Sequence, residues 1–231
     1  MSEPTRWTAT NSEGYEAPAA LAVVVVVLKA HAGELCALVV RRDDGLLALP
    51  GGFVGAEESP QDTAERKLAE KTGVERVYLE QLATFAEPGG DPRGWIPTVA
   101  YVALVPGDTE ATDEAARWVP ARGRHRLARD HRRILRAAVD RIEGKLWWSN
   151  VAVGALPREF ALSDARRVYE AIAQTVYDPA TFARDLKATG LIEPTGRPRQ
   201  EGPGRPATLY RFVHSKPSWG AGRRKRIRPA P

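Results

Sequence analysis

The stretch Gly52–Val74, which reads GFVGAEESPQDTAERKLAEKTGV, is the most informative part of this 231-residue chain. It belongs to a glycine-rich loop, Leu49–Gly55, that is followed by a helical segment reaching Lys71. Gly73 is expected to stop that helix, because glycine readily adopts the left-handed conformation that follows a helix. The stretch therefore predicts a loop joined directly to a helix.

Segments with the pattern of β-strands surround this helix. The apolar run Leu21–Leu28 has eight residues, whereas a membrane helix needs about 20, so it is interpreted as a buried strand. A helix is expected from near Asp130 to Glu143, with Gly144 as its end. Further strands are expected at Leu35–Val40, Tyr78–Phe85 and Thr98–Val105. This mixture predicts a layered α/β domain that ends near residue 143.

The spacing within Gly52–Val74 matches a known signature. The Nudix signature, G-x5-E-x7-R-E-U-x-E-E-x-G-U with U aliphatic, has nine fixed positions. Seven of them are matched in one register, by Gly52, Glu58, Arg66, Leu68, Glu70, Gly73 and Val74. The region therefore resembles the Nudix family, and the resemblance implies an α/β/α sandwich.

Two departures from the signature bear on function. The resemblance implies that three glutamates of this helix hold Mg²⁺ against a pyrophosphate in Nudix hydrolases. Here those positions are Lys67, Glu70 and Lys71, so their summed charge is +1 in place of −3. Ammonium groups repel a metal and cannot coordinate it, so we expect the usual hydrolysis to be lost. Lys67 or Lys71 either contacts ligand phosphates directly or is exposed without a specific role.

Other candidate ligand contacts flank the helix. Arg41 and Arg42 precede the loop and could face a phosphate, or they are surface charges. In the loop, Gly52 is a candidate contact, and Phe53 either stacks on a base or belongs to the core. Arg93 lies in a DPRG turn that resembles the turn of ADP-ribose-directed Nudix proteins, or it is part of an ordinary turn.

The C-terminal part of the chain has a different pattern. Ser163 is expected to cap a helix that runs to about Thr175, with Val168, Ile172 and Val176 on one face. Asp178-Pro179 opens a second helix that stops at Gly190. Two strand-like runs, Leu191–Glu193 and Thr208–Val213, flank the loop Thr195–Pro206. This order of elements is that of a winged helix-turn-helix domain.

The charge distribution favours nucleic acid as the partner of this second domain. The net charge of +5 hides an asymmetry, because residues 144–231 carry +9 and residues 1–143 carry −4. Basic segments attract phosphate backbones through counterion release. On the second helix Phe182 and Leu186 are expected to point inward, which leaves other side chains for the major groove. The candidate DNA contacts are Thr181, Arg184 and Lys187 on this helix and Arg197, Arg199, Arg205 and Arg211 in or beside the wing.

A degenerate Nudix domain joined to a winged helix resembles the NrtR family of Nudix-related regulators of NAD metabolism. Trp148–Ala152, Leu156–Phe160 and Gly204–Phe212 are similar to segments of that family. The resemblance implies a dimeric repressor of NAD synthesis or salvage genes that ADP-ribose or a related NAD derivative releases from its operator. Ala183 and Asp185 depart from the basic residues expected in the recognition helix, which puts the operator sequence in question.

The predicted organisation has four parts. These are a flexible N-terminus at 1–17, a Nudix-like nucleotide-sensing domain at 18–143, a winged helix-turn-helix domain at 144–214 and a basic tail at 215–231. The expected partners are a double-stranded DNA operator, a nucleotide effector and a second copy of the chain. We expect no catalytic residue, metal, cofactor or membrane partner. The polar N-terminus and the single cysteine, Cys36, favour a cytoplasmic protein that is nucleoid-associated when it is bound to DNA.

Two other functions remain open at this point. The first is an active Mg²⁺-dependent Nudix hydrolase of ADP-ribose or a dinucleotide, with Glu57, Glu58 and Glu70 as metal ligands and the basic half as an accessory domain. The second is an RNA-binding module built on the basic half, although the aromatic residues there show no stacking-platform pattern.

Overall fold

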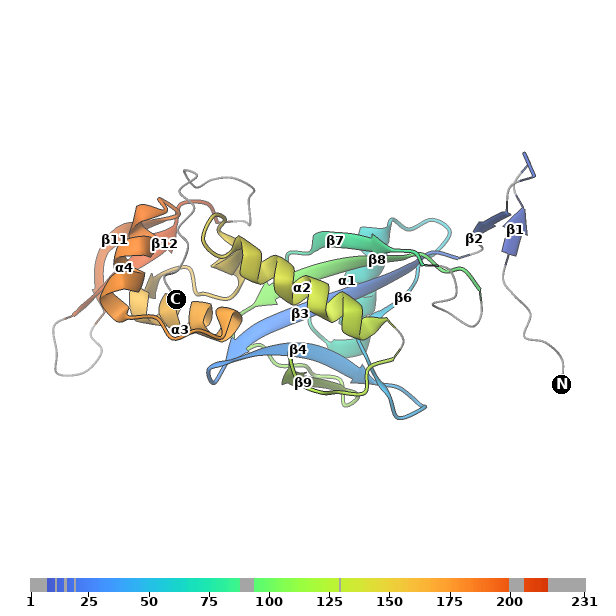
Figure 1. Ribbon diagram of the computed structural model, residues 1–231, viewed down its shortest axis with the longest axis horizontal. Coiled ribbons are helices and arrows are strands. Elements are labelled where there is room, and N and C mark those ends of the chain that lie inside the picture. Colours follow the sequence, from blue (N-terminus) through green and yellow to red (C-terminus); the bar gives the residue numbers. More distant parts are fainter. Residues whose placement is uncertain are drawn as a thin grey trace. The chain divides into compact units, whose positions relative to one another are not determined.

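The computed structural model describes residues 8–10, 12–14, 16–18, 20–87, 94–128, 130–199 and 206–215. The chain divides into two compact units (Figure 1). The first unit comprises Met1–Val27, Ala37–Ala103 and Glu110–Ala138, and the second comprises Leu28–Cys36, Leu104–Thr109 and Val139–Pro231. The boundary expected near residue 143 lies inside a helix, and the division between the units falls between Ala138 and Val139.

A seven-stranded sheet organises the Nudix-like part of the chain. Its main path has the order β5-β4-β3-β8-β7, while β6 pairs with β3 and β9 pairs with β4. The bounds are β3 Ala22–His31, β4 Glu34–Arg41, β5 Leu47–Ala48, β6 Gly51–Phe53, β7 Glu80–Phe85, β8 Thr98–Val105 and β9 Ala116–Pro120. The four longer strands confirm the sequence predictions, and β8 has the predicted bounds. The short strands β5, β6 and β9 were not predicted, because so few residues carry no readable alternation.

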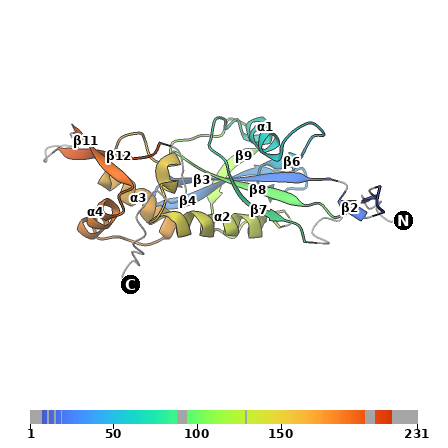
Figure 2. The same ribbon diagram turned by 90° about the horizontal axis from the view of Figure 1, so that it is seen from above.

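The two long helices lie on opposite faces of this sheet (Figures 1 and 2). They are α1, Pro60–Thr72, and α2, His131–Lys145. The central strand β3 is covered on both faces, since every side chain from Val23 to Leu28 is at most 5% exposed. A strand buried on both faces has a continuous apolar sequence, which is the pattern seen in Leu21–Leu28. The α/β/α sandwich that the sequence predicted is therefore present.

Local signals determine both ends of α1. The Ser59 side-chain oxygen accepts a hydrogen bond of 3.1 Å from the backbone N–H of Asp62, and Pro60 occupies the first turn. At the other end Gly73 has φ +69° and its N–H bonds to the carbonyl of Ala69. Leu68 is 1% exposed and anchors the helix to the sheet. Helix α1 thus begins and ends where its capping residues stand.

The predicted end of α2 is wrong. Gly144 lies inside the helix, which continues to Lys145. A glycine in a helix costs only about 0.5–1 kcal/mol relative to alanine. Burial of the residues around it, including Ile142, Lys145 and Leu146, offsets that cost. The helix therefore continues through the glycine.

The second unit contains the predicted winged helix-turn-helix. Helices α3, Leu162–Ala173, and α4, Pro179–Ala188, stand in the sequence between β10 and the pair β11 and β12 (Figure 1), and these three strands form a sheet with the order β10-β12-β11. Its strands are antiparallel, with bounds β10 Phe160–Ala161, β11 Ile192–Arg199 and β12 Ala207–Phe212. A short 3₁₀ helix, η1, covers Val151–Gly154. Strand β11 is longer than predicted, because its pairing with β12 resumes at Pro198 after an irregularity that begins at Pro194.

Two details of α3 differ from the sequence prediction. Ser163 does not cap the helix, since the N-cap position is occupied by Ala161. The Asp164 carboxylate instead accepts a hydrogen bond of 3.1 Å from the Ala161 N–H. Val176 does not extend the apolar face, because Gln174 adopts a left-handed conformation that ends the helix and Val176 is 88% exposed.

Aromatic side chains form the core of the second unit. Trp147 makes edge contacts with Tyr169, Tyr177 and Phe182, with ring centroids 5.2, 5.6 and 5.7 Å apart. Tyr169 is fully buried and donates a hydrogen bond of 3.0 Å to the carbonyl of Leu146. Edge-to-face pairs of this kind add stability beyond the area they bury. These aromatics are therefore core residues and do not form a stacking platform, as the sequence analysis anticipated.

The ends of the chain are described only in part. Strands β1, Thr8–Thr10, and β2, Glu16–Pro18, pair antiparallel within the segment that was expected to be flexible. The predicted basic tail lies outside the described residues except at position 215. Over the described ranges, no helix is sufficiently long and apolar to cross a membrane.

The pairing of β6 with β3 leads to a stability prediction. A Cβ atom added to Gly51 would lie 2.2 Å from the Val23 carbonyl oxygen and 3.0 Å from the Val24 Cα, and backbone atoms cannot move aside cheaply. We expect Gly51→Ala to lower the free energy of unfolding by about 1–3 kcal/mol, measured by urea denaturation. Gly144→Ala is the control, because a Cβ there meets no atom within 4 Å. It should leave stability unchanged or raise it by up to about 1 kcal/mol, and equal losses in both variants would contradict the steric explanation.

Candidate functional site

A cavity of about 720 Å³ opens in the first unit. Its wall includes the end of β4, the short strand β6, the last turn of α1 and the first turn of α2. Drug-sized and nucleotide-sized ligands occupy pockets of about 300–1,000 Å³. Arg41, Arg42 and Lys71 bring positive charge to a lining that also contains six carboxylates, and aromatic surface comes from Phe53 and Phe85. The cavity thus combines groups suited to phosphates with groups suited to a base.

Most of the predicted ligand contacts meet in this cavity. Arg41, Arg42, Gly52, Phe53 and Lys71 all line it, although they are spread over 31 positions of the sequence. Arg42 also forms an ion pair of 2.9 Å with Asp44, and Phe53 is 36% exposed, so it is not a core residue. Arg93 lies outside the described residues.

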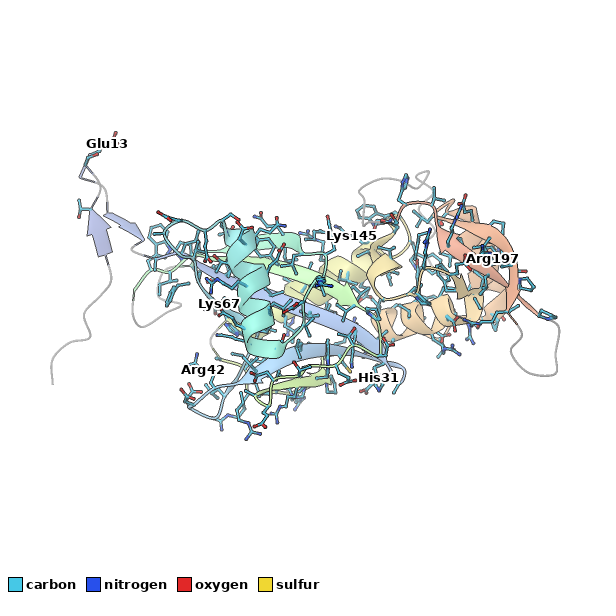
Figure 3. All side chains as sticks on the ribbon, turned by 180° about the vertical axis from the view of Figure 1, so that it is seen from behind. Glu13, His31, Arg42, Lys67, Lys145 and Arg197 are labelled. Atoms are coloured by element: carbon cyan, nitrogen blue, oxygen red, sulfur yellow. The ribbon has the colours of Figure 1, made fainter. Side chains whose placement is uncertain are left out.

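Lys67 is placed differently from Lys71. Its carbon chain packs against Gly52, where an added Cβ would lie 2.9 Å from Lys67 Cε. Lys67 lies on α1 (Figure 3). Its ammonium bonds to Glu70 Oε2 at 2.7 Å, and it is not one of the described residues that line the cavity. Lys71 does line the cavity, and partial burial, followed by the nearby Lys67 charge, lowers its pKa. Of the two lysines, Lys71 is therefore the one positioned for a ligand.

Ion pairs occupy two acidic side chains of the Nudix signature, Glu58 just before α1 and Glu70 within it. Arg66 bonds to both oxygens of Glu58, at 2.7 and 2.5 Å, and to Glu70 at 2.8 Å. Thr63 donates a further hydrogen bond of 2.8 Å to Glu58. The Arg66 hydrogen bonds, then that of Thr63, lower the pKa of Glu58 to about 2. Hydrogen bonds from Lys67 and then Arg66 lower the pKa of Glu70.

This arrangement does not fit the Mg²⁺ ion that the Nudix resemblance implies for hydrolases. Hard cations require several oxygen ligands that converge on one point. Glu58 and Glu70 direct their oxygens at Arg66 and Lys67, and Lys71 adds a second ammonium group one turn after Lys67. Within the described ranges, no group of three or more His, Cys, Asp or Glu side chains is placed to hold a metal.

The cavity also contains residues that the sequence analysis missed. His131 accepts a hydrogen bond of 2.9 Å at Nδ1 from the backbone N–H of Leu49. His131, Asp130 and Ile134, in and just before the first turn of α2, belong to the lining. No local pattern marks them, because they reach the cavity only through tertiary packing of a helix about 80 residues away in sequence.

The exposed face of α4 forms a second candidate site. Asp178 caps this helix by accepting a hydrogen bond of 2.8 Å from the Thr181 N–H. Phe182 and Leu186 are buried, as predicted, so Thr181, Arg184 and Lys187 are left exposed. Arg184 is 72% exposed and pairs with the neighbouring Asp185 at 2.9 Å. Lys187 lies over the ring of Tyr210, 5.5 Å from its centroid.

The arginines in and beside the wing differ in exposure and in the acidic side chains that they bind. Arg197 is 75% exposed, with Glu159 at 3.5 Å (Figure 3). Arg211 pairs across the strands with Glu193 at 2.7 Å and is half exposed. Arg199 bonds to Asp164 at 2.6 Å, and this carboxylate also binds the first turn of α3. Arg205 lies outside the described residues.

Comparison with known families agrees with this architecture. Residues 18–138 match the model of the NUDIX domain, and residues 152–212 match that of the NrtR DNA-binding winged helix domain. The protein is thus of the class in which a Nudix-type domain precedes a winged helix. Across 84% of the chain and 82% of the relative, it is 32% identical to the "ADPR responsive transcriptional repressor NtrR" of Acinetobacter baylyi. The chain belongs to the NrtR family of Nudix-related transcriptional regulators.

Solved structures show the same relationship. Shewanella oneidensis NrtR complexed with a 27mer DNA is 33% identical and has a TM-score of 0.70, covering 83% of this chain and 93% of that one. The NUDIX domain of the same Shewanella protein, complexed with ADP ribose, is 34% identical with a TM-score of 0.52. That match covers 57% of this chain and 93% of the other.

The Glu58–Arg66 pair predicts a dependence of stability on pH. The pKa of Glu58 in the folded protein, about 2, lies below its ordinary value of 4.5. The stabilisation from this ionised pair is therefore complete above about pH 4.5 and is lost as the pH falls toward 2. We expect the thermal midpoint of Glu58→Gln to fall less steeply than that of the wild type between pH 5 and pH 2.5. Parallel curves for the two proteins would contradict the assignment.

Proposed function

We propose that this protein is a transcriptional regulator that binds operator DNA through the winged helix of its second unit. A nucleotide in the cavity of the first unit controls this binding. The observation that carries the proposal is the presence in one chain of a winged helix whose α4 exposes Arg184 and Lys187 and of a nucleotide-sized cavity lined by Lys71, at a position where the Nudix signature has a glutamate. The Acinetobacter relative named for its ADP-ribose response and the Shewanella complexes with DNA and with ADP ribose support it.

The effector in this proposal is ADP-ribose or a related NAD derivative. Arg41, Arg42 and Lys71 provide three positive charges for its two phosphates. Phe53 or Phe85 offers a face on which adenine stacks. Arg93 is proposed as a further contact. Lys67 supports the site indirectly, since it packs under Gly52 and pairs with Glu70.

Binding without turnover is part of the same proposal. The carboxylates that would hold Mg²⁺ are paired with Arg66 and Lys67, and Lys71 places a cation where the hydrolases have an acidic ligand. A fixed ammonium neutralises phosphate charge but cannot generate a nucleophile from water as a metal does. The domain therefore acts as a sensor and needs no cofactor.

The DNA-binding part acts as a homodimer that represses genes of NAD synthesis or salvage. Two copies of α4 enter major grooves about one DNA turn, roughly 34–36 Å, apart. Effector binding changes the operator affinity by a coupling free energy of about 1–3 kcal/mol. The protein acts in the cytoplasm and is associated with the nucleoid when it is bound to DNA.

The first prediction from this proposal concerns the purified full-length protein. It should bind duplex DNA from upstream of NAD-metabolism genes, and saturating ADP-ribose should change the dissociation constant by about 5–150-fold, measured by fluorescence anisotropy at fixed salt. Lys71→Ala should weaken ADP-ribose binding and leave operator binding without effector unchanged. If operator affinity shows no preference for these sequences and no response to ADP-ribose, the proposal is wrong.

The same preparation tests the alternatives. Mg²⁺-dependent turnover of ADP-ribose that Glu70→Gln abolishes would favour an active hydrolase. Preference for single-stranded RNA over duplex DNA would favour the RNA-binding module.

The salt dependence of operator binding separates phosphate contacts from positioning contacts. Each lost phosphate contact reduces the slope of log K against log salt by about 0.9. Because Arg184 is largely exposed and each copy in the proposed homodimer supplies one, we expect Arg184→Ala to reduce the slope by about 1.8. Arg199→Ala should leave the slope unchanged while weakening affinity, because its guanidinium is bound to Asp164 and holds the wing to α3.

Arg117→Ala is the matched control, since Arg117 is an exposed arginine on β9 of the first unit. It should change neither slope nor affinity. A slope change for Arg199→Ala as large as that for Arg184→Ala would make Arg199 a phosphate contact.

A further inference from the structure

One hydrogen bond ties the cavity loop to the helix that enters the second unit. His131, the first residue of α2, accepts at Nδ1 from the Leu49 N–H, 2.9 Å away. Because Nδ1 accepts, the neutral ring carries its proton on Nε2. Leu49 is 2% exposed and stands two residues before Gly51–Phe53, all of which line the cavity together with His131. A movement of this loop therefore acts on the His131 ring.

A second connection to the same turn of α2 is weaker. Arg133 pairs with Glu87, and its guanidinium lies 5.1 Å from the centroid of Phe85, both of which line the cavity. Arg133 and Glu87 are 50% and 52% exposed, and exposed ion pairs are screened by solvent and contribute little. The N–H of buried Leu49 cannot exchange its partner for water so easily. His131 is thus the stronger of the two connections.

The opposite end of α2 leads into the core beneath the recognition helix. The residue after α2, Leu146, accepts the hydrogen bond of buried Tyr169, 3.0 Å long. The next residue, Trp147, packs against Phe182, which is the buried anchor of α4. Helix α2 passes from the first unit into the second as one continuous helix with its own hydrogen-bond ladder, so it offers a route by which a shift of its first turn can reach its last turn.

We infer that His131 is a positioning residue through which an occupied cavity acts on α2 and so on DNA binding. The inference rests on the proposed function. A ligand that moves Gly51–Phe53 moves the Leu49 N–H, and the His131 acceptor follows because a buried donor without a partner is unfavourable. This positioning requires only a hydrogen-bond acceptor at the place of Nδ1, and it does not require an imidazole ring.

Four variants of the full-length protein test this role. His131→Phe keeps a ring of similar shape but removes the acceptor, and His131→Gln moves the amide too far along the side chain to replace Nδ1. His131→Asn places an amide oxygen near the position of Nδ1 and so retains the acceptor. Arg133→Gln removes the exposed connection on the same turn and is the control. The readouts are operator affinity with and without saturating ADP-ribose, and ADP-ribose affinity by calorimetry.

We expect His131→Phe and His131→Gln to bind the operator without effector within about threefold of the wild type. ADP-ribose should then change their operator affinity by less than about twofold, below the range typical of allosteric coupling. His131→Asn and Arg133→Gln should keep the wild-type response to ADP-ribose. Because two variants lack the acceptor, failure of one to fold leaves the other as the test.

The outcomes that overturn the inference are distinct from failure of the proposed function. If the wild type does not respond to ADP-ribose, the proposed function fails and the inference fails with it. A responsive wild type with equally responsive His131→Phe and His131→Gln overturns only the role of His131. Loss of the response in His131→Asn as well, with ADP-ribose affinity reduced in parallel, overturns the positioning role and makes the ring a direct ligand contact.

Discussion

The close approach of β6 to β3 is the constraint on which the rest of the first unit depends. Gly51 leaves no room for a side chain beside the Val23 carbonyl, so the two strands pair backbone to backbone. That pairing holds Gly52 and Phe53 at the sheet, and Gly52 in turn leaves space for the carbon chain of Lys67. The position of α1, and with it the cavity wall, follows from these two glycines.

Charge on α1 has been redistributed without loss of the Nudix scaffold. In the hydrolase pattern, the acids of this helix converge on a cation, whereas here Arg66 and Lys67 satisfy Glu58 and Glu70 within the helix and its loop. The pairs are partly exposed, so they contribute modestly to stability. Their main consequence is that the charges of Glu58 and Glu70 are balanced by Arg66 and Lys67, while Lys71 lines the cavity.

The charged residues of the second unit fall into two groups, those with exposed side chains and those that hold elements of the unit together. Arg184, Lys187 and Arg197 have exposed side chains, as an electrostatic contact with DNA requires. Asp164 instead collects hydrogen bonds from the start of α3 and from Arg199, and so joins the wing to the helix pair. The aromatic core around Trp147 and Phe182 supports both sets, because it holds α4 from its buried side.

Sequence alone determined the two-domain organisation, the bounds of β8 and the faces of α4, because hydrophobic periodicity and caps are local properties. Of the seven expected cavity residues, the Nudix loop and helix located Gly52, Phe53 and Lys71, and the end of the preceding strand located Arg41 and Arg42. Tertiary structure decided the rest. Gly144 remains helical because the residues around it, Ile142, Lys145 and Leu146, are buried, and Arg199 turns to Asp164, which lies 35 residues earlier in the chain. His131 reaches the cavity for the same reason, since its hydrogen-bond partner lies 82 residues earlier in the chain.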